Sequence, residues 1–273
     1  MFAKILENTA SCHPLVHCIT NYISANDCAN ILLACGASPI MADALQEVEE
    51  ITSHANALVL NMGTLNEDKL RSMLCAGQQA NRLGIPIILD PVGVGASTFR
   101  RNAAKQLLET LHLTVIRGNA SEIETLTTYQ SVSQGIDVNT TSLESTSLLF
   151  AQELSKKIGA IVVISGATDL ITYKRTTYQV FNGHPILTRI TGTGCMLTSL
   201  IGAYCGANPS SLLEATVAAV GTMGLCAELA YDQTESSQRG TGTLRIRLLD
   251  AISLLTPTQL QGGLCYDKHQ TSP

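Results

Sequence analysis

A glycine-rich turn at residues 191–195 is the segment of this chain whose residue types best suit chemistry. Thr191-Gly192-Thr193-Gly194-Cys195 precedes an apolar run of helical character. Glycines let several backbone N–H groups point at one place, and the positive end of the helix dipole would point there too. Gly192, Thr193, Gly194 and Cys195 are therefore predicted to form an anion hole suited to phosphate, with Cys195 in the first helical turn, where a thiolate is favoured. A plain glycine turn followed by a buried cysteine fits the spacing equally well.

Three charged side chains near the ends of apolar runs could serve the phosphates of a nucleotide. Asp90 closes one run, and Glu122 lies in the first turn of an expected helix. Both carboxylates could hold Mg²⁺, directly or through water. Arg117 directly follows another apolar run and needs a partner, which a phosphate would supply. An Asp-Pro turn and a glutamate at a helix N-terminus are common features without a metal, so that alternative stays open.

Other familiar sites are not supported by the sequence. It has no P-loop, and Gly93-Val94-Gly95 lacks the third glycine of a dinucleotide fingerprint, which argues against a P-loop NTPase or an ordinary dehydrogenase. The six histidines show no metal spacing, and Met41 is by default a core methionine. The nine cysteines are odd in number and lack C-x-x-C spacing, which favours reduced, buried thiols in a cytosolic protein.

The charge content narrows the class of protein. Only 14% of the 273 residues are charged, against about 25% in an average protein. The hydrophobic fraction of 45% and the net charge of −5 argue against a disordered chain and against nucleic acid as a partner. Residues 190–213 lack charge but are interrupted by Gly, Asn, Pro and Ser, so we expect no membrane span. Residues 1–10 lack an apolar run, so we expect no secretory signal.

The elements that must position these residues alternate between short apolar runs and segments of helical period. The expected strands are 15–20, 38–41, 57–62, 86–89, 113–117 and 160–165, with a hairpin from 170–173 and 178–181. The expected helices are 24–36, 43–53, 66–83, 100–111, 143–158, 195–206, 210–231 and a last one at 244–255, with an exposed loop at 128–142. Such alternation predicts an α/β fold, a mostly parallel sheet with helices on both faces. With no linker or repeat in sight, residues 1–273 are expected to form a single domain.

In an open parallel sheet, ligands bind beyond the carboxyl ends of the strands. Polar or glycine-rich segments follow five of the apolar runs, namely Ile19-Thr20-Asn21, Asn61-Met62-Gly63-Thr64, Asp90-Pro91-Val92-Gly93, Arg117-Gly118-Asn119 and Ser165-Gly166-Ala167. Any single one of them is adequately explained as a turn. Together they place the expected site at one edge of the sheet.

Several of these segments together resemble the hydroxyethylthiazole kinase family, which belongs to the ribokinase-like kinases. The resemblance covers nearly the whole chain. The segments that carry it are PLVHCITNYISANDCANILLACGASPIMA (14–42), LNMGTL (60–65), ILDPVGVGAS (88–97), VIRGNASEI (115–123) and NGHPILTRITGTGCMLTSLIGAY (182–204). The implied fold is a ribokinase-like three-layer sandwich.

The resemblance implies an ATP-dependent kinase for the primary alcohol of 4-methyl-5-(2-hydroxyethyl)thiazole, a salvage step for thiamine diphosphate. It implies Mg²⁺ and a homotrimer with sites near subunit interfaces. The composition adds the expectation of a cytoplasmic protein with neither nucleic acid nor membrane as a partner. By the same resemblance, Met41 and Gly192 contact the thiazole with Asn21 nearby, Arg117 and Ser165 bind ATP, and Asp90 and Glu122 serve Mg²⁺. Cys195 is expected near the substrate hydroxyl, as a base that assists its deprotonation.

Three departures and three rival functions accompany this hypothesis. Cys195 stands where the wider superfamily has an aspartate, Ser165 stands where threonine is commoner, and Leu244 stands where an aromatic residue is usual. The rivals are a hydroxymethylpyrimidine kinase of the same fold, an ATP-dependent dehydratase that repairs hydrated NADH, and an inactive binding subunit. Nothing in the sequence is degraded, which argues against the last of these.

Overall fold

The computed structural model describes residues 1–130 and 143–270, and within these residues nine strands form one sheet. The strands are β1 (Leu15–Ile19), β2 (Ser38–Ile40), β3 (Ala57–Asn61), β4 (Ile87–Asp90), β5 (Val115–Asn119), β6 (Ile161–Ser165), β7 (Asp169–Tyr173), β8 (Thr176–Val180) and β9 (Tyr266–Gln270). Their order is β2-β1-β3-β4-β5-β6-β7-β8-β9. Neighbours from β2 to β6 are parallel, and those from β6 to β9 are antiparallel. The predicted mostly parallel sheet with a late antiparallel part is confirmed.

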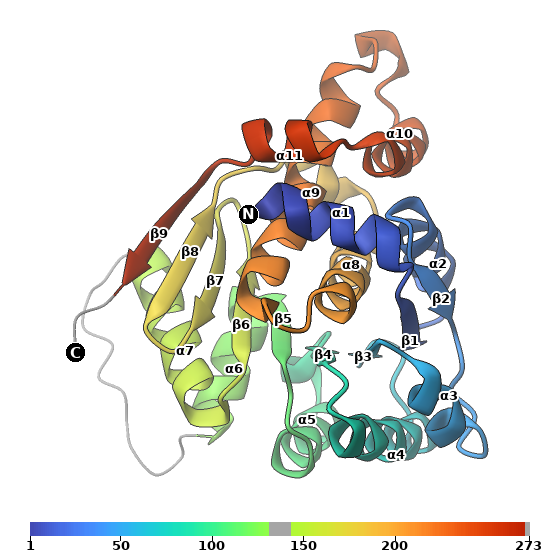
Figure 1. The fold of residues 1–273 in the computed structure, drawn as a ribbon. Coiled ribbons are helices and arrows are strands. Elements are labelled where there is room, and N and C mark those ends of the chain that lie inside the picture. The colour runs from blue at the N-terminus through green and yellow to red at the C-terminus, as the bar shows by residue number, and fades with distance from the viewer. Residues whose placement is uncertain (131–142, 271–273) are drawn as a thin grey trace.

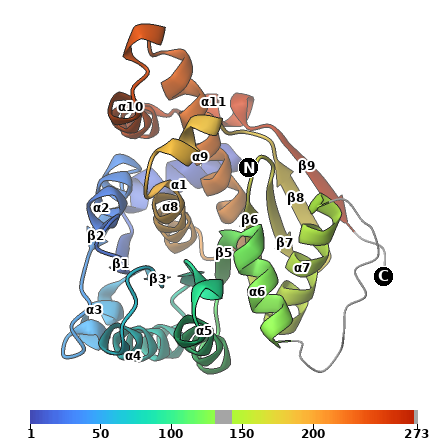
Figure 2. The ribbon, with the colours of Figure 1, turned by 180° about the vertical axis from the view of Figure 1, so that it is seen from behind.

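Helices cover both faces of the sheet (Figures 1 and 2). They are α1 (Phe2–Cys12), α2 (Ala25–Ala34), α3 (Val48–His54), α4 (Glu67–Leu83), α5 (Thr98–Thr110), α6 (Ala120–Gln130), α7 (Leu143–Ile158), α8 (Thr193–Ala207), α9 (Leu212–Asp232), α10 (Thr241–Leu254) and α11 (Pro257–Gly263). One layer contains α3 to α7. The other contains α1, α2, α8, α9, α10 and α11, with α8 against β1, β3 and β4, and α9 against β7 and β8 (Figure 1).

Side chains of the buried strands alternate between the two faces of the sheet, and each face forms a hydrophobic core with the helices that cover it. In β3, Val59 packs with the α8 and α9 layer, whereas Leu58 and Leu60 pack with the opposite layer. In β6, Val163 packs with the α8 and α9 layer, and Val162 packs with the opposite layer. Successive side chains of a strand point to opposite faces, so a strand that is apolar throughout is stable only between two helical layers.

Local signals explain where several elements begin and end. The Asn66 side chain accepts a hydrogen bond of 2.8 Å from the backbone N–H of Lys69, and Gly84 ends the same helix at a φ of 69°. These are the cap and stop that the sequence indicates for α4. Ser24 precedes α2 as expected, although its side chain makes no cap hydrogen bond.

Some expected elements differ from the structure. Residues 43 and 44 are irregular and residues 45–47 form a turn, so α3 begins only at Val48, and residues 128–130 belong to α6. The rest of the expected loop, 131–142, lies outside the described residues. Helix α10 is not the last element, because α11 and β9 follow it, and α1 was not expected at all. Arg117, expected at the end of its strand, lies in the middle of β5, two residues before that strand ends at Asn119.

One helix passes the length and composition test for a membrane span, although no such segment was expected from the sequence. Among the described residues, α9 is long and apolar enough to cross a membrane by length and composition alone. In this structure 72% of the relevant stretch is buried inside the molecule. Its apolar character is therefore accounted for by the core, where α9 packs against α8, β7 and β8.

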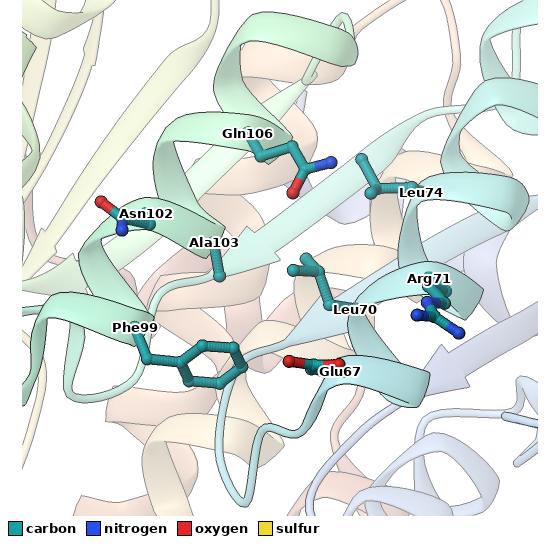
Figure 3. Close-up of a pocket in the computed structure, with 8 residues that line it drawn as sticks. All are labelled: Glu67, Leu70, Arg71, Leu74, Phe99, Asn102, Ala103 and Gln106. Carbon is teal, nitrogen blue, oxygen red and sulfur yellow. The ribbon is translucent and has the colours of Figure 1, made fainter.

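A shallow pocket of about 310 Å³ lies between α4 and α5, in the layer opposite α8. Figure 3 shows Phe99 of α5 pointing toward Glu67 and Leu70 of α4, with Arg71 and Gln106 also along its wall. None of the residues that the sequence singles out for chemistry lines this pocket.

Candidate active site

Cys195 lies at the centre of a small group of polar side chains. It occupies the first turn of α8 and is partly buried, and its Sγ accepts hydrogen bonds from the side-chain amides of Asn21 and Asn61, both at 3.2 Å. Asn21 follows β1 and Asn61 ends β3, and these strands are neighbours in the sheet. The structure thus brings Cys195 and Asn21 together, and it adds Asn61, for which no individual role was predicted.

The two amides are held in one orientation by backbone groups. Asn21 Oδ1 accepts from the N–H groups of Ile23 and Ser24, at 3.1 and 3.0 Å. Asn61 Oδ1 accepts from the Asn21 amide at 3.0 Å and from the Gly63 N–H at 2.9 Å. With both oxygens engaged in this way, both NH₂ groups face the sulfur. The arrangement makes Cys195 an acceptor, as a group that takes a proton must be.

Asp90 is fully buried at the end of β4, beside these asparagines. Its Oδ2 accepts from Asn61 at 3.0 Å and from the Thr198 hydroxyl at 2.8 Å, and it lies 3.8 Å from Arg117. Burial raises the pKa of Asp90 to about 6, against the opposing effects of Arg117 and Thr198. Among residues 1–130 and 143–270, no side chain or backbone group donates a hydrogen bond to Asp90 Oδ1, which is also buried. An unsatisfied buried carboxylate oxygen indicates a missing partner.

Arg117 joins Asp90 to the glycine turn and to Ser165. Its guanidinium donates to Ser165 Oγ on the neighbouring strand β6. A Cβ atom on Gly194 would lie 2.6 Å from Arg117 Nη1, so only glycine lets the arginine approach the start of α8 this closely. Arg117 Nε is buried without a hydrogen-bond partner in the described part of the chain. The Nε–H group of Arg117 is therefore available to donate a hydrogen bond to an anion.

The turn before α8 has the shape expected of an anion hole. Gly192 has a φ of 82°, and a Cβ there would lie 3.0 Å from Ser24 Cβ, so backbone conformation and space both favour glycine. The Thr193 hydroxyl donates to Leu187 O at 3.1 Å and fixes the preceding loop. The first N–H groups of a helix lack intrahelical partners, so those of Thr193, Gly194 and Cys195 are free to meet a ligand.

Glu122 makes the contacts expected of a glutamate at a helix N-terminus, which was the alternative to a role in metal binding. Its Oε2 accepts from the Asn119 N–H and its Oε1 from the Gly93 N–H, both at 2.9 Å. It therefore caps α6 and ties the loop after β4 to it. Among the described residues, no group of three or more His, Cys, Asp or Glu side chains is arranged to hold a metal. Mg²⁺ beside a nucleotide needs only one or two carboxylates, because phosphates and water supply the other ligands. Asp90 Oδ1 and the remaining lone pairs of Glu122 fit that requirement.

A cavity of about 530 Å³ opens beside the glycine turn. Arg117, Ser165, Thr193 and Gly194 form its polar end. Apolar side chains that include Leu187, Leu197, Val220 and Met223 line much of the remainder, together with polar ones that include Asp169, Asn182 and His184. An apolar space with polar groups converging at one end is typical of a ligand pocket, and this one suits a base and its phosphates.

Met41 does not behave as a core methionine. It follows the edge strand β2 and its exposed fraction is 38%, so the default interpretation is wrong. Its exposure follows from the position of β2 at the end of the sheet, where no further strand covers it. No contact among the described residues joins Met41 to Cys195, and its place near the substrate stays a prediction.

The other cysteines contrast with Cys195. Cys28, Cys35, Cys205 and Cys226 are buried, and all nine cysteines are free thiols. Burial raises the pKa of Cys28 to about 11 and that of Cys35 to about 12. The prediction of reduced, buried thiols in apolar runs is confirmed for these four.

Asp169, which lines this cavity, should make the stability of the folded protein depend on pH. Burial raises the pKa of Asp169 from 3.8 to about 6, against the Gly166 N–H and Arg117. Because the pKa is higher in the folded state, Asp169 contributes stability to the folded protein below pH 3.8. This contribution is lost as the pH rises through about 6 and the buried carboxyl must ionise. Asp169→Asn keeps an Oδ1 acceptor for Gly166 but does not titrate. We expect this variant to gain in stability relative to the wild type as the pH rises through that range.

Urea unfolding below pH 4 and above pH 6 measures this difference. Asp68→Asn serves as the control, because the Asp68 side chain is almost fully exposed. A constant difference between Asp169→Asn and the wild type at both pH values would contradict the expectation.

Comparisons with known proteins agree on one family. Residues 6–258 match the model of the hydroxyethylthiazole kinase family. A hydroxyethylthiazole kinase of Clostridium acetobutylicum is 48% identical, over 98% of this chain and 100% of that protein. The solved hydroxyethylthiazole kinase of Pyrococcus horikoshii OT3 is 34% identical, with a TM-score of 0.89, over 98% of this chain and 99% of that one. A ribokinase-like superfamily protein of Enterococcus faecalis V583 is 14% identical, with a TM-score of 0.64 over 95% of this chain and 94% of that one, which shows the fold alone.

Proposed function

The chain belongs to the hydroxyethylthiazole kinase family, and from this premise we propose how its residues transfer the γ-phosphoryl group of ATP to the primary hydroxyl of 4-methyl-5-(2-hydroxyethyl)thiazole. The product would be the thiazole phosphate, which thiazole salvage supplies to thiamine diphosphate synthesis. The observation that carries the proposal is the position of Cys195, whose sulfur lies at the start of α8 between two oriented amides. An acceptor for a proton and a cradle for phosphate thus share one helical turn.

The nucleotide occupies the cavity beside the glycine turn. Its base lies among the apolar side chains, and its phosphates lie at the end formed by Arg117, Ser165 and Gly194. Arg117 neutralises phosphate charge with donors that the protein leaves unused. The N–H groups from Gly192 to Cys195 stabilise the moving phosphoryl group, since phosphoryl transfer depends mainly on positioning and on charge stabilisation.

The acceptor alcohol approaches Cys195 from the side of Asn21. Met41 and Gly192 contact the thiazole ring, with Asn21 nearby. The hydroxyl oxygen bonds to the γ-phosphorus while the bond from that phosphorus to the bridging oxygen breaks, and ADP leaves. Cys195 takes the hydroxyl proton. A general base contributes about 10²–10⁴-fold, and a thiolate is an imperfect base for an alcohol, so we expect the low end of that range.

Mg²⁺ would be held by Asp90 and Glu122 and would neutralise triphosphate charge. Asp90 contributes the buried oxygen that lacks a protein partner. The backbone contacts of Glu122 hold its carboxylate on the loop after β4, close to the end of β5.

We place the reaction in one catalytic domain, residues 1–273, of a cytoplasmic homotrimer. Exposed apolar side chains beside the site support the assembly. Tyr22 and Ile23 directly follow Asn21 and are about 70% exposed, and Met41 and Leu45 are exposed after β2. A neighbouring subunit that covered them would also close the thiazole side of the site.

A coupled assay of ADP formation tests the function. We expect ADP release to depend on hydroxyethylthiazole, and removal of divalent cations by EDTA to stop it. Hydroxymethylpyrimidine, offered in place of the thiazole, is the control for a kinase of different specificity. ADP formation that hydroxyethylthiazole does not stimulate would reject the proposal.

A further inference from the structure

Lys69 is a buried charged residue for which no role was predicted from the sequence. It lies in the first turn of α4, and only about 2% of its side chain is exposed. Its Nζ donates to the Thr20 carbonyl at 2.8 Å and lies 3.8 Å from Asp43 Oδ2. The same ammonium lies 4.2 Å from the centre of the Tyr22 ring. One cation therefore contacts a carbonyl, a carboxylate and an aromatic face.

The partners of Lys69 flank the two segments proposed to meet the thiazole. Thr20 and Tyr22 are the neighbours of Asn21, whose amide donates to Cys195 Sγ. Asp43 is two residues from Met41, in the segment after β2. Through its contacts with Thr20 and Asp43, Lys69 thus links the end of β1 to the segment that follows β2.

Helix stability does not explain a lysine at this position. The first turn of a helix is the positive end of its dipole, where a cation is unfavourable. Burial lowers the pKa of Lys69, and Asp43 only partly opposes this effect. A methionine of similar length would fill the space without the desolvation cost of a charge. We therefore attribute the presence of a lysine here to the groups that its ammonium contacts, namely Thr20, Tyr22 and Asp43.

We propose that Lys69 is a positioning residue for the acceptor alcohol. By fixing the turn at Thr20 and Tyr22, it holds the Asn21 amide against Cys195, and through Asp43 it sets the segment that carries Met41. This inference rests on the proposed function of the site. Lys69 touches neither the cavity proposed for the nucleotide nor Arg117, so its effect is confined to the thiazole side.

The test is Lys69→Met, measured by calorimetric titration with hydroxyethylthiazole and by steady-state kinetics. We expect the Kd and KM for the thiazole to rise about tenfold, as for the loss of a charged hydrogen bond. The KM for ATP should stay within about twofold, because the contacts of Arg117 are untouched. A merely structural role would instead affect both substrates. Lys105→Met is the control, because Lys105 is an exposed lysine paired with Glu109 on α5.

Two further variants keep the test decisive if Lys69→Met fails to fold. Asp43→Asn removes one partner and should weaken thiazole binding by a smaller factor in the same direction. Lys69→Arg keeps the charge and should recover part of the thiazole affinity. Wild-type thiazole affinity in folded Lys69→Met, or in folded Asp43→Asn, would overturn the inference. Wild-type protein that neither binds nor phosphorylates the thiazole would instead overturn the proposed function.

Discussion

Replacing Arg117 with methionine is expected to raise the KM for ATP about a hundredfold while hydroxyethylthiazole binding stays near the wild-type value. A charged hydrogen bond contributes about 1.5–3 kcal/mol, and Arg117 offers phosphate more than one donor. Its guanidinium lies against Gly194 and donates to Ser165, at the polar end of the cavity. Charge reversal in Arg117→Glu should raise the KM further, because a carboxylate repels the triphosphate.

Steady-state kinetics with each substrate varied in turn separate the two effects. Arg71→Met is the matched control, because Arg71 is exposed on α4. Removing Arg117 leaves the buried carboxylate of Asp90 without its cation, so a thermal unfolding curve must accompany the kinetics. An unchanged KM for ATP in folded Arg117→Met would remove this residue from the nucleotide site.

Cys195→Ala is expected to lower kcat about a hundredfold and to leave both KM values nearly unchanged. The alanine variant keeps the backbone N–H groups of the glycine turn, so phosphate binding survives while the proton acceptor is lost. The amides of Asn21 and Asn61 lose their shared partner but keep their contacts with each other.

Cys195→Asp should remain active, because its carboxylate supplies a base at the same place in the first turn. The measurement is kcat with saturating ATP and thiazole, and Cys12→Ala, which changes an exposed cysteine, is the control. Turnover of Cys195→Ala at the wild-type rate would show that Cys195 only packs at the site.

Elements with strong local patterns could be predicted from the sequence. The strand at 57–61 contains a continuous apolar run at 57–60, and α4 has both a side-chain cap at Asn66 and a glycine stop. Helix α1 was missed although Phe2, Ile5, Leu6 and Thr9 form one buried face, since a short segment at a terminus gave no cap signal. Helix α11 was missed although Thr256 and Gln259 form a capping box.

The site was predictable only where its residues sit in recognisable segments. Asp90, Arg117, Ser165 and the glycine turn meet as the sequence indicated, because parallel strands end at the same edge of a sheet. Asn61 and Thr198 were assigned no role, since an amide at a strand end and a threonine inside an apolar helix are ordinary residues. Their roles depend on side-chain orientation, which comes from contacts between residues up to 134 positions apart.

The division of the core between two layers has a consequence for how the protein is made. The core of the α3 to α7 layer draws on residues 19–170, whereas the other core draws on residues 2–260 and includes the packing of α1 on α11. During synthesis, the first core can consolidate on the ribosome while α1 and α2 still expose apolar surface and await their partners. Asn61 and Asp90 would then be in place before α8 brings Cys195 to them. A nascent chain interrupted before α8 would thus hold half of the site and bind neither substrate productively.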